Sequence, residues 1–164
     1  MGVNKGTAFE RRLEGIFHAY LRQGRAKIHK TDPPVKVFGR PGHQRVRLLD
    51  NHWLDFAGIW TEQGGRAIML EAKWTEKRLL PIDRSPGMSE NQMANLRAWS
   101  KAGAATGVLW GMGNTIKLIS VQMIDAAIAD SGRVSIQWCD GIPVQPGEGF
   151  ITHDILTTLA AFQA

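Results

Sequence analysis

The stretch Ile68-Met69-Leu70-Glu71-Ala72-Lys73 decides the fold and indicates the chemistry of this 164-residue chain. Its apolar half predicts a buried strand, which ends in a glutamate, a small residue and a lysine. Side chains alternate across a strand, so Glu71 and Lys73 project to one face while Ala72 points to the other. A carboxylate and an ammonium are therefore expected side by side at a strand end.

A second apolar stretch, Leu54-Asp55-Phe56-Ala57-Gly58-Ile59-Trp60, carries an acid near its start. The intervening residues 61–65 end in two glycines and predict a hairpin loop. If Asp55 lies opposite Glu71, two carboxylates and the Lys73 ammonium converge. Buried carboxylates need partners or a metal, and carboxylate oxygens suit Mg²⁺. The two stretches therefore predict a Mg²⁺ site.

Such a site is typical of phosphodiester hydrolysis, in which the metal neutralises phosphate charge and produces a nucleophilic hydroxide. Asp55, Glu71 and the carbonyl of Ala72 are the expected metal ligands. Lys73 is expected to orient or deprotonate the attacking water and to stabilise the transition state. A salt-bridged pair on an exposed strand is the structural alternative for the Glu-x-Lys pattern.

Two further candidates lie on predicted helices. Gln92, on a helix expected over residues 89–102 with Ser89 as its cap, is expected to hydrogen-bond the water or the phosphate. Glu10, on a helix expected over 4–23 with Asn4 and Thr7 as possible caps, is expected to complete the metal shell directly or through water. Taken alone, each could be an ordinary surface residue.

Positive charge is concentrated near the N-terminus. The first 50 residues hold 11 Lys and Arg against 4 Asp and Glu, whereas the remainder hold 9 against 11. This asymmetry favours a polyanionic partner, with a solvated basic face as the alternative. Residues 31–51 are basic and broken by prolines and glycines, while valines alternate with polar residues. This pattern predicts an extended arm or ribbon that projects from the body.

The remaining pattern predicts one α/β domain over residues 1–164. Strands are expected at 26–29, 54–60, 66–73, 107–111 and 115–119, and further helices at 125–129 and 154–162. Trp53 and Trp74 flank the acidic site, where each could stack on a base or pack in the core. The lone Cys139 and the lack of an apolar run of about 20 residues favour a cytoplasmic protein without a membrane partner.

The order of these pieces resembles the RecU-type Holliday junction resolvases, which are PD-(D/E)xK nucleases. The matching pieces are Asn4-Lys5-Gly6, Phe9-Glu10, 26–30, Pro33-Pro34, Asp55 with Gly58, 70–73, 80–82, Asn91-Gln92 and 103–108. The resemblance implies a restriction-endonuclease-like fold, with a central mixed sheet flanked by helices and residues 31–51 as a stalk. The chain differs from the family pattern at His52-Trp53-Leu54, and at Asn91, where the family has histidine.

The resemblance also implies a homodimer that binds four-way DNA junctions and makes paired symmetric nicks with Mg²⁺ or Mn²⁺. Asp55, Glu71, Lys73, Glu10 and Gln92 match family site residues. The side chains expected to contact DNA are Lys5, Arg11, Lys30, Lys36, Arg40, Arg45 and Arg47. Two alternatives stay open: another PD-(D/E)xK endonuclease acting on duplex or single strands, and a non-catalytic DNA-binding module.

Overall fold

The computed structural model describes residues 4–32, 35–38, 40, 43, 45–48, 54–82, 87–132, 135–149 and 151–162, with the backbone alone for 35–38, 45–48 and 131. Among these residues, none of the helices has the length and apolar character that a bilayer crossing requires. The predicted candidates Trp53 and the side chains of Lys36, Arg45 and Arg47 lie outside the described part.

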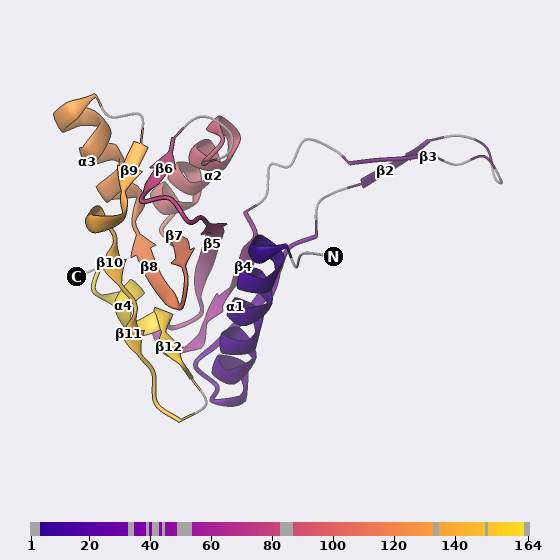
Figure 1. Cartoon of the computed structure of the whole chain (residues 1–164). Coiled ribbons are helices and arrows are strands. Elements are labelled where there is room, and N and C mark those ends of the chain that lie inside the picture. Colours follow the sequence, from indigo (N-terminus) through magenta and orange to yellow (C-terminus); the bar gives the residue numbers. More distant parts are fainter. Residues whose placement is uncertain are drawn as a thin grey trace.

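A mixed sheet forms the centre of the molecule (Figure 1). Its strand order is β1-β4-β5-β7-β8-β10, in which β5 and β7 run parallel and the other neighbours antiparallel. The strands are β1 (Ala26–Lys30), β4 (Phe56–Trp60), β5 (Arg66–Trp74), β7 (Ala105–Met112), β8 (Thr115–Ile119) and β10 (Ile142–Pro143). This sheet and its flanking helices confirm the predicted fold class.

Helices cover both faces of the sheet (Figure 1). One core cluster joins α1 (Lys5–Arg22) and α4 (Ile155–Ala160) to one face, where Leu70 and Leu109 are buried. A second cluster joins α2 (Glu90–Lys101) and α3 (Val121–Ser131) to the other face, where Met69 and Val108 are buried. Neighbouring residues of one strand thus enter different clusters, as the alternation of strand side chains requires. For the same reason, the side chains of Glu71 and Lys73 project to the same face of β5 as that of Met69.

Side-chain caps set where several helices begin. The Asn4 side chain accepts from the Gly6 N–H at the start of α1, and Ser89 accepts from the Gln92 N–H at the start of α2, so both predicted caps are confirmed. Thr7 lies inside α1 and is not its cap. Ser120 accepts from the Met123 N–H, which starts α3 at Val121, several residues before the predicted start.

The predicted start of the strand at 54 was wrong, whereas the predicted hairpin loop at 61–65 is confirmed. Asp55 directly precedes β4 instead of lying within the strand, and its side chain accepts from the Ala72 N–H of β5. The expected loop 61–65 begins with a short 3-10 helix, η1 (Thr61–Gln63), and then turns through Gly64 and Gly65, which have φ of 67° and 86°. These positive φ values favour glycine, so the loop still reverses the chain.

The chain also contains short elements, before and after α2, that the sequence patterns do not predict. They are β6 (Leu79–Pro81) paired with β9 (Ser135–Gln137), η2 (Trp138–Asp140), and β11 (Gln145–Pro146) paired with β12 (His153–Asp154). The Trp138 ring packs edge-on against Trp110, with centroids 4.9 Å apart. The buried Tyr20 hydroxyl accepts from the Ile155 N–H at 2.7 Å. The C-terminal segment is therefore part of both cores.

A two-stranded hairpin projects from the body next to β4 and α1 (Figure 1). Its strands are β2 (Val35–Phe38) and β3 (Arg45–Leu48), which pair antiparallel from Val35↔Leu48 to Phe38↔Arg45. Among the described strands, β2 and β3 pair only with each other. Within the arm predicted over residues 31–51, residues 35–38 and 45–48 thus form a β-ribbon.

Candidate active site

The predicted acids meet where β4 begins and β5 ends. The register pairs Phe56 with Leu70, which sets Asp55 opposite Glu71. Asp55 Oδ2 accepts from the Ala72 N–H at 2.9 Å, and the Asp55 N–H donates to Glu71 Oε2 at 3.4 Å. The condition on which the sequence prediction depended, that Asp55 lies opposite Glu71, is met.

Glu71 is the most buried residue of this group, at 1 % exposed. Its Oε1 lies 2.8 Å from Lys73 Nζ and also accepts from Gln92 Nε2. Burial, followed by the charge of Asp55, raises the pKa of Glu71 to about 8, although Lys73 acts in the opposite direction. The carboxyl group therefore lacks enough positive charge around it to stay ionised as an ordinary glutamate does.

The orientation of Gln92 is determined by the N-terminus of α2. Its Oε1 accepts from the Ser89 N–H at 3.0 Å, while Ser89 Oγ accepts from the Gln92 N–H at 3.2 Å. Because this capping box engages the amide oxygen, the amide nitrogen is the atom that faces Glu71. The sequence identifies Ser89 only as a cap, and its link to the site depends on the packing of α2 against β5.

Glu10 is linked to the acid cluster by Lys30, which pairs with Glu10. Lys30 Nζ donates to Glu10 Oε2 at 2.6 Å, and this hydrogen bond raises the pKa of Lys30, with smaller contributions from the charges of Glu14 and Asp55. Among the described residues, no three His, Cys, Asp or Glu are grouped closely enough to hold a metal. The structure thus brings together Asp55, Glu71, Lys73 and Gln92, and the metal role of Glu10 stays a prediction.

The donor set suits a hard divalent cation. In a strand, the N–H and C=O of one residue point to the same side, so the Ala72 carbonyl faces the side on which its N–H meets Asp55. Two carboxylates and a carbonyl are the oxygen ligands that Mg²⁺ prefers. A cation there would also relieve the repulsion that raises the Glu71 pKa. The residues present therefore fit the predicted metal.

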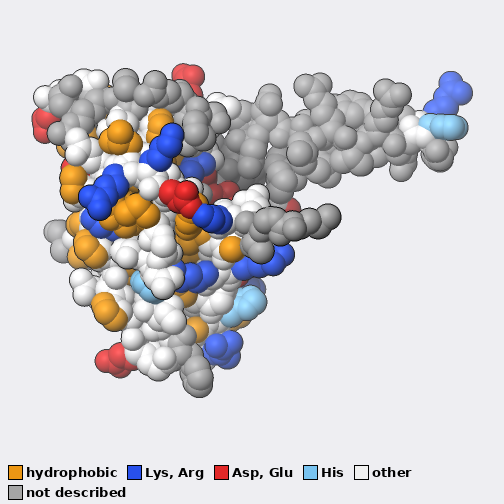
Figure 2. All heavy atoms as spheres, in the orientation of Figure 1, with side chains coloured by type: hydrophobic (Ala, Val, Ile, Leu, Met, Phe, Trp, Pro, Cys, Tyr) orange, Lys and Arg blue, Asp and Glu red, His pale blue; other side chains and the backbone are white. Residues whose placement is uncertain are grey.

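The predicted DNA-contacting side chains are divided between body and hairpin. Arg11 is exposed, Lys30 bonds Glu10, and Lys5 forms an exposed ion pair with Glu76. Arg40 is exposed between β2 and β3, and Figure 2 shows basic and histidine side chains at the far end of the projection. Lys36 and Arg47 sit opposite each other in the hairpin backbone.

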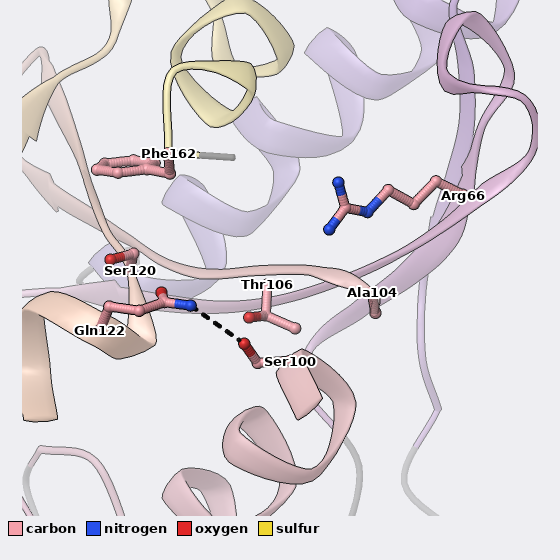
Figure 3. Close-up of a pocket in the computed structure, with 7 residues that line it drawn as sticks. All are labelled: Arg66, Ser100, Ala104, Thr106, Ser120, Gln122 and Phe162. Atoms are coloured by element: carbon pink, nitrogen blue, oxygen red, sulfur yellow. Dashed lines mark hydrogen bonds between the residues drawn. The ribbon is translucent and has the colours of Figure 1, made fainter. Parts of the chain in front are cut away.

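A polar pocket, drawn in Figure 3, lies where the parallel strands β5 and β7 begin, at the end opposite to the acids. It has a volume of about 140 Å³ and is lined by Arg66, Ser100, Ala104, Thr106, Ser120, Gln122 and Phe162. Arg66 begins β5, whereas Glu71 and Lys73 lie toward its end. Arg66 Nε donates to the Gly103 carbonyl at 2.7 Å, and Gln122 Nε2 donates to Ser100 Oγ at 3.4 Å. These two hydrogen bonds connect residues of loops and helix ends, and neither involves a residue of the acid cluster.

The curated proteins to which this chain is similar are named as Holliday junction resolvases. Holliday junction resolvase RecU of Streptococcus pneumoniae strain Hungary19A-6 is 30% identical over 88 residues, which cover 49% of this chain and 43% of that protein. The resemblance to RecU is confirmed. RecU of strain G54 is 28% identical over the same length. The chain thus matches less than half the length of these RecU proteins.

No family model matches the chain. Among solved structures, Hjc, a Holliday junction resolvase from the archaeal hyperthermophile Archaeoglobus fulgidus, has a TM-score of 0.45 and 19% identity. That match covers 73% of this chain and 75% of Hjc.

Proposed function

We propose that this chain is a divalent-metal-dependent endodeoxyribonuclease that resolves four-way DNA junctions by paired symmetric nicks. The observation that carries the proposal is the contact of Asp55, Glu71 and Lys73 at the strand ends. The similarity to RecU supports the choice of substrate, because the matched relatives are Holliday junction resolvases by name.

Asp55, Glu71 and the Ala72 carbonyl would hold Mg²⁺, or Mn²⁺ in its place, and the bound ion would supply charge neutralisation at the phosphate and acidify a water. Lys73 Nζ orients the attacking water and stabilises negative charge that develops on the phosphate. Its position 2.8 Å from Glu71 supports this role. Gln92 holds one Glu71 oxygen, so the carboxylate keeps one orientation.

The β2–β3 hairpin selects the substrate by entering the open centre of the junction. Its projection away from the sheet supports this role, since a linear duplex offers no such opening. On the body, Lys5, Arg11 and Lys30 contact phosphates of the duplex arms. Phosphate contacts of this kind position DNA without reading its sequence.

Paired nicks require two sites related by symmetry. A junction has two-fold related strands, and a two-fold homodimer presents one acid cluster to each. We infer that the functional unit is a homodimer for this reason.

A substrate comparison tests the proposal. Labelled four-way junction, linear duplex and flap DNA are incubated with the protein and Mg²⁺ at one salt concentration, because binding to phosphate depends strongly on salt. Preferential nicking of the junction at symmetric positions is expected. Equal cleavage of duplex or flap would instead favour another nuclease of the PD-(D/E)xK class. Absence of nicking with both Mg²⁺ and Mn²⁺ would favour a non-catalytic DNA-binding module.

A further inference from the structure

A groove lies between the N-terminal half of α1 and the end of β5. It has a volume of about 220 Å³ and is lined by Lys5, Ala8, Phe9, Arg12, Trp74, Gly113 and Asn114. We call it the α1–Trp74 groove. Trp74 directly follows Lys73 in the chain, so the groove borders the strand end that carries the acid cluster, on the face covered by α1.

The floor of the groove is rigid and apolar. Phe9 is 4 % exposed and belongs to the core cluster between α1 and the sheet. A Cβ at Gly111 would lie 2.6 Å from the Phe9 ring, so glycine is required there for the ring to pack this closely. The Trp74 indole packs against the same cluster and stays partly exposed. One aromatic ring is thus buried beneath the groove and a second one lines it.

Two cations lie along the groove. Lys5 Nζ is 5.2 Å from the centre of the Trp74 ring and pairs with Glu76. Both members of that pair are largely exposed, so the pair costs little to break. Arg12 Nη2 donates to the Asn114 carbonyl at 2.7 Å and lies 3.2 Å from the ring nitrogens of His153. These contacts keep the guanidinium at the groove.

We propose that the α1–Trp74 groove binds an unstacked nucleobase of the DNA strand, which stacks on Trp74 while neighbouring phosphates contact Lys5 and Arg12. Proteins hold single-stranded DNA by aromatic stacking within a positive groove, and the two cations match the charge of the strand. Trp74 directly follows Lys73 along β5 but faces the opposite side of the sheet, so the bound nucleotide lies on the α1 side of the strand end and not at the cleaved phosphate itself. The inference rests on the proposed function for its substrate.

The test pairs Trp74→Ala with abasic DNA, in a Glu71→Gln background so that binding is measured without cleavage. A set of four-way junctions carries one abasic nucleotide at successive positions around the cut. On intact DNA, Trp74→Ala is expected to weaken binding roughly 5-fold to 150-fold, the equivalent of one lost stacking contact. At one abasic position the same substitution should cause almost no further loss, because the stacked base is already absent.

Matched variants separate stacking from folding and from general charge. Trp74→Phe keeps an aromatic ring and should retain most of the binding. Lys5→Ala should weaken binding and reduce its salt dependence, whereas Lys101→Ala, an exposed lysine at the far end of α2, should change neither. A similar effect of Trp74→Ala at every abasic position, or no effect on intact DNA, would overturn the proposal.

A second probe distinguishes failure of this inference from failure of the proposed function. A single-stranded oligonucleotide that quenches the tryptophan fluorescence of the unmodified protein but not that of Trp74→Ala, together with absence of junction cleavage by the unmodified protein, would contradict the proposed function alone. Junction cleavage that proceeds normally in Trp74→Ala, with no loss of binding, would contradict the groove alone.

Discussion

Glu71 is the residue on which the site depends, because it combines full burial with two donors on a single oxygen. A buried carboxylate is unfavourable unless it is paired, and Asp55 adds a second negative charge beside it. Lys73 and Gln92 both engage Oε1, while the Asp55 N–H lies 3.4 Å from Oε2. Without a cation, this arrangement favours a protonated Glu71.

The raised pKa gives a stability prediction for the metal-free protein. Burial and Asp55 raise the Glu71 pKa to about 8, above the ordinary value of 4.5. The folded state therefore binds the proton more tightly than the unfolded state, so its stabilising contribution is complete below pH 4.5 and is lost as the pH rises through 8. The loss can reach about 1.4 kcal/mol per pH unit within this window.

Glu71→Gln removes that titration. In chelator, we expect thermal unfolding to show the variant gaining stability over the unmodified protein at pH 8 relative to pH 5. Adding Mg²⁺ at pH 8 should stabilise the unmodified protein more than the variant. An equal effect of the substitution at both pH values would contradict the account of Glu71.

Ser89 acts on the site through Gln92. Ser89→Ala is expected to destabilise the protein by about 1 kcal/mol through the lost cap and to lower cleavage by roughly 10-fold to 100-fold through the freed Gln92. The measurement is single-turnover cleavage alongside denaturant unfolding. Ser120→Ala removes an equivalent cap from α3 and serves as the control, which should lose stability without losing activity. Equal loss of activity in both variants would show that Ser89 has no positioning role.

Residues that act through strand alternation could be predicted from the sequence. Glu71 and Lys73 project to one face of the same strand. Asp55 lies opposite Glu71 once the hairpin pairs the two strands in the right register. The Gln92 contact with Glu71 could not be predicted, because it depends on how α2 packs against the sheet. The pairing of Glu10 with Lys30 was also missed, since nothing in the spacing brings α1 beside the end of β1.

At the scale of elements, periodic segments were predicted and short ones were not. α1 and α2 carry apolar residues at helical spacing and side-chain caps, and their predicted bounds fall within about two residues of the observed ones. The strands β9 to β12 have two or three residues each, too few for any period to be visible. Their positions depend on pairing partners such as β6 and β8.

The hairpin can be removed to test its role. Replacing residues 33–47 by a short Gly-Ser linker should weaken junction binding more than duplex binding, because only a junction has a centre for the hairpin to enter. Thermal stability should change little, since among the described strands β2 and β3 pair only with each other. Titrations of both DNAs at matched salt give the comparison. Equal losses on junction and duplex would remove the hairpin from substrate selection.

At the scale of the whole molecule, the C-terminal segment links the two faces. Trp138 packs on Trp110 in one core, while Arg25 pairs with Asp154 at 3.2 Å near the other. The C-terminal segment is therefore packed into both layers that enclose the central sheet. The predicted homodimer would double this arrangement around a two-fold axis.

Mixed dimers test that assembly. A cruciform plasmid cut by paired nicks becomes linear, whereas a single nick leaves an open circle. Co-refolding the unmodified protein with an excess of Glu71→Gln should shift the product from linear DNA to open circles, because most active subunits then have an inactive partner. Product that stays linear in proportion to the active subunits would contradict paired cutting by a dimer.

The most direct test of the central claim is a nicking assay on a labelled four-way junction with Mg²⁺, using the unmodified protein, Asp55→Asn and Glu71→Gln. The same samples are scored for junction binding in Ca²⁺ or chelator. Symmetric nicks are expected from the unmodified protein, and both variants should lose at least about 10²-fold in cleavage while retaining binding. Junction cleavage by either variant at the rate of the unmodified protein would contradict the central claim.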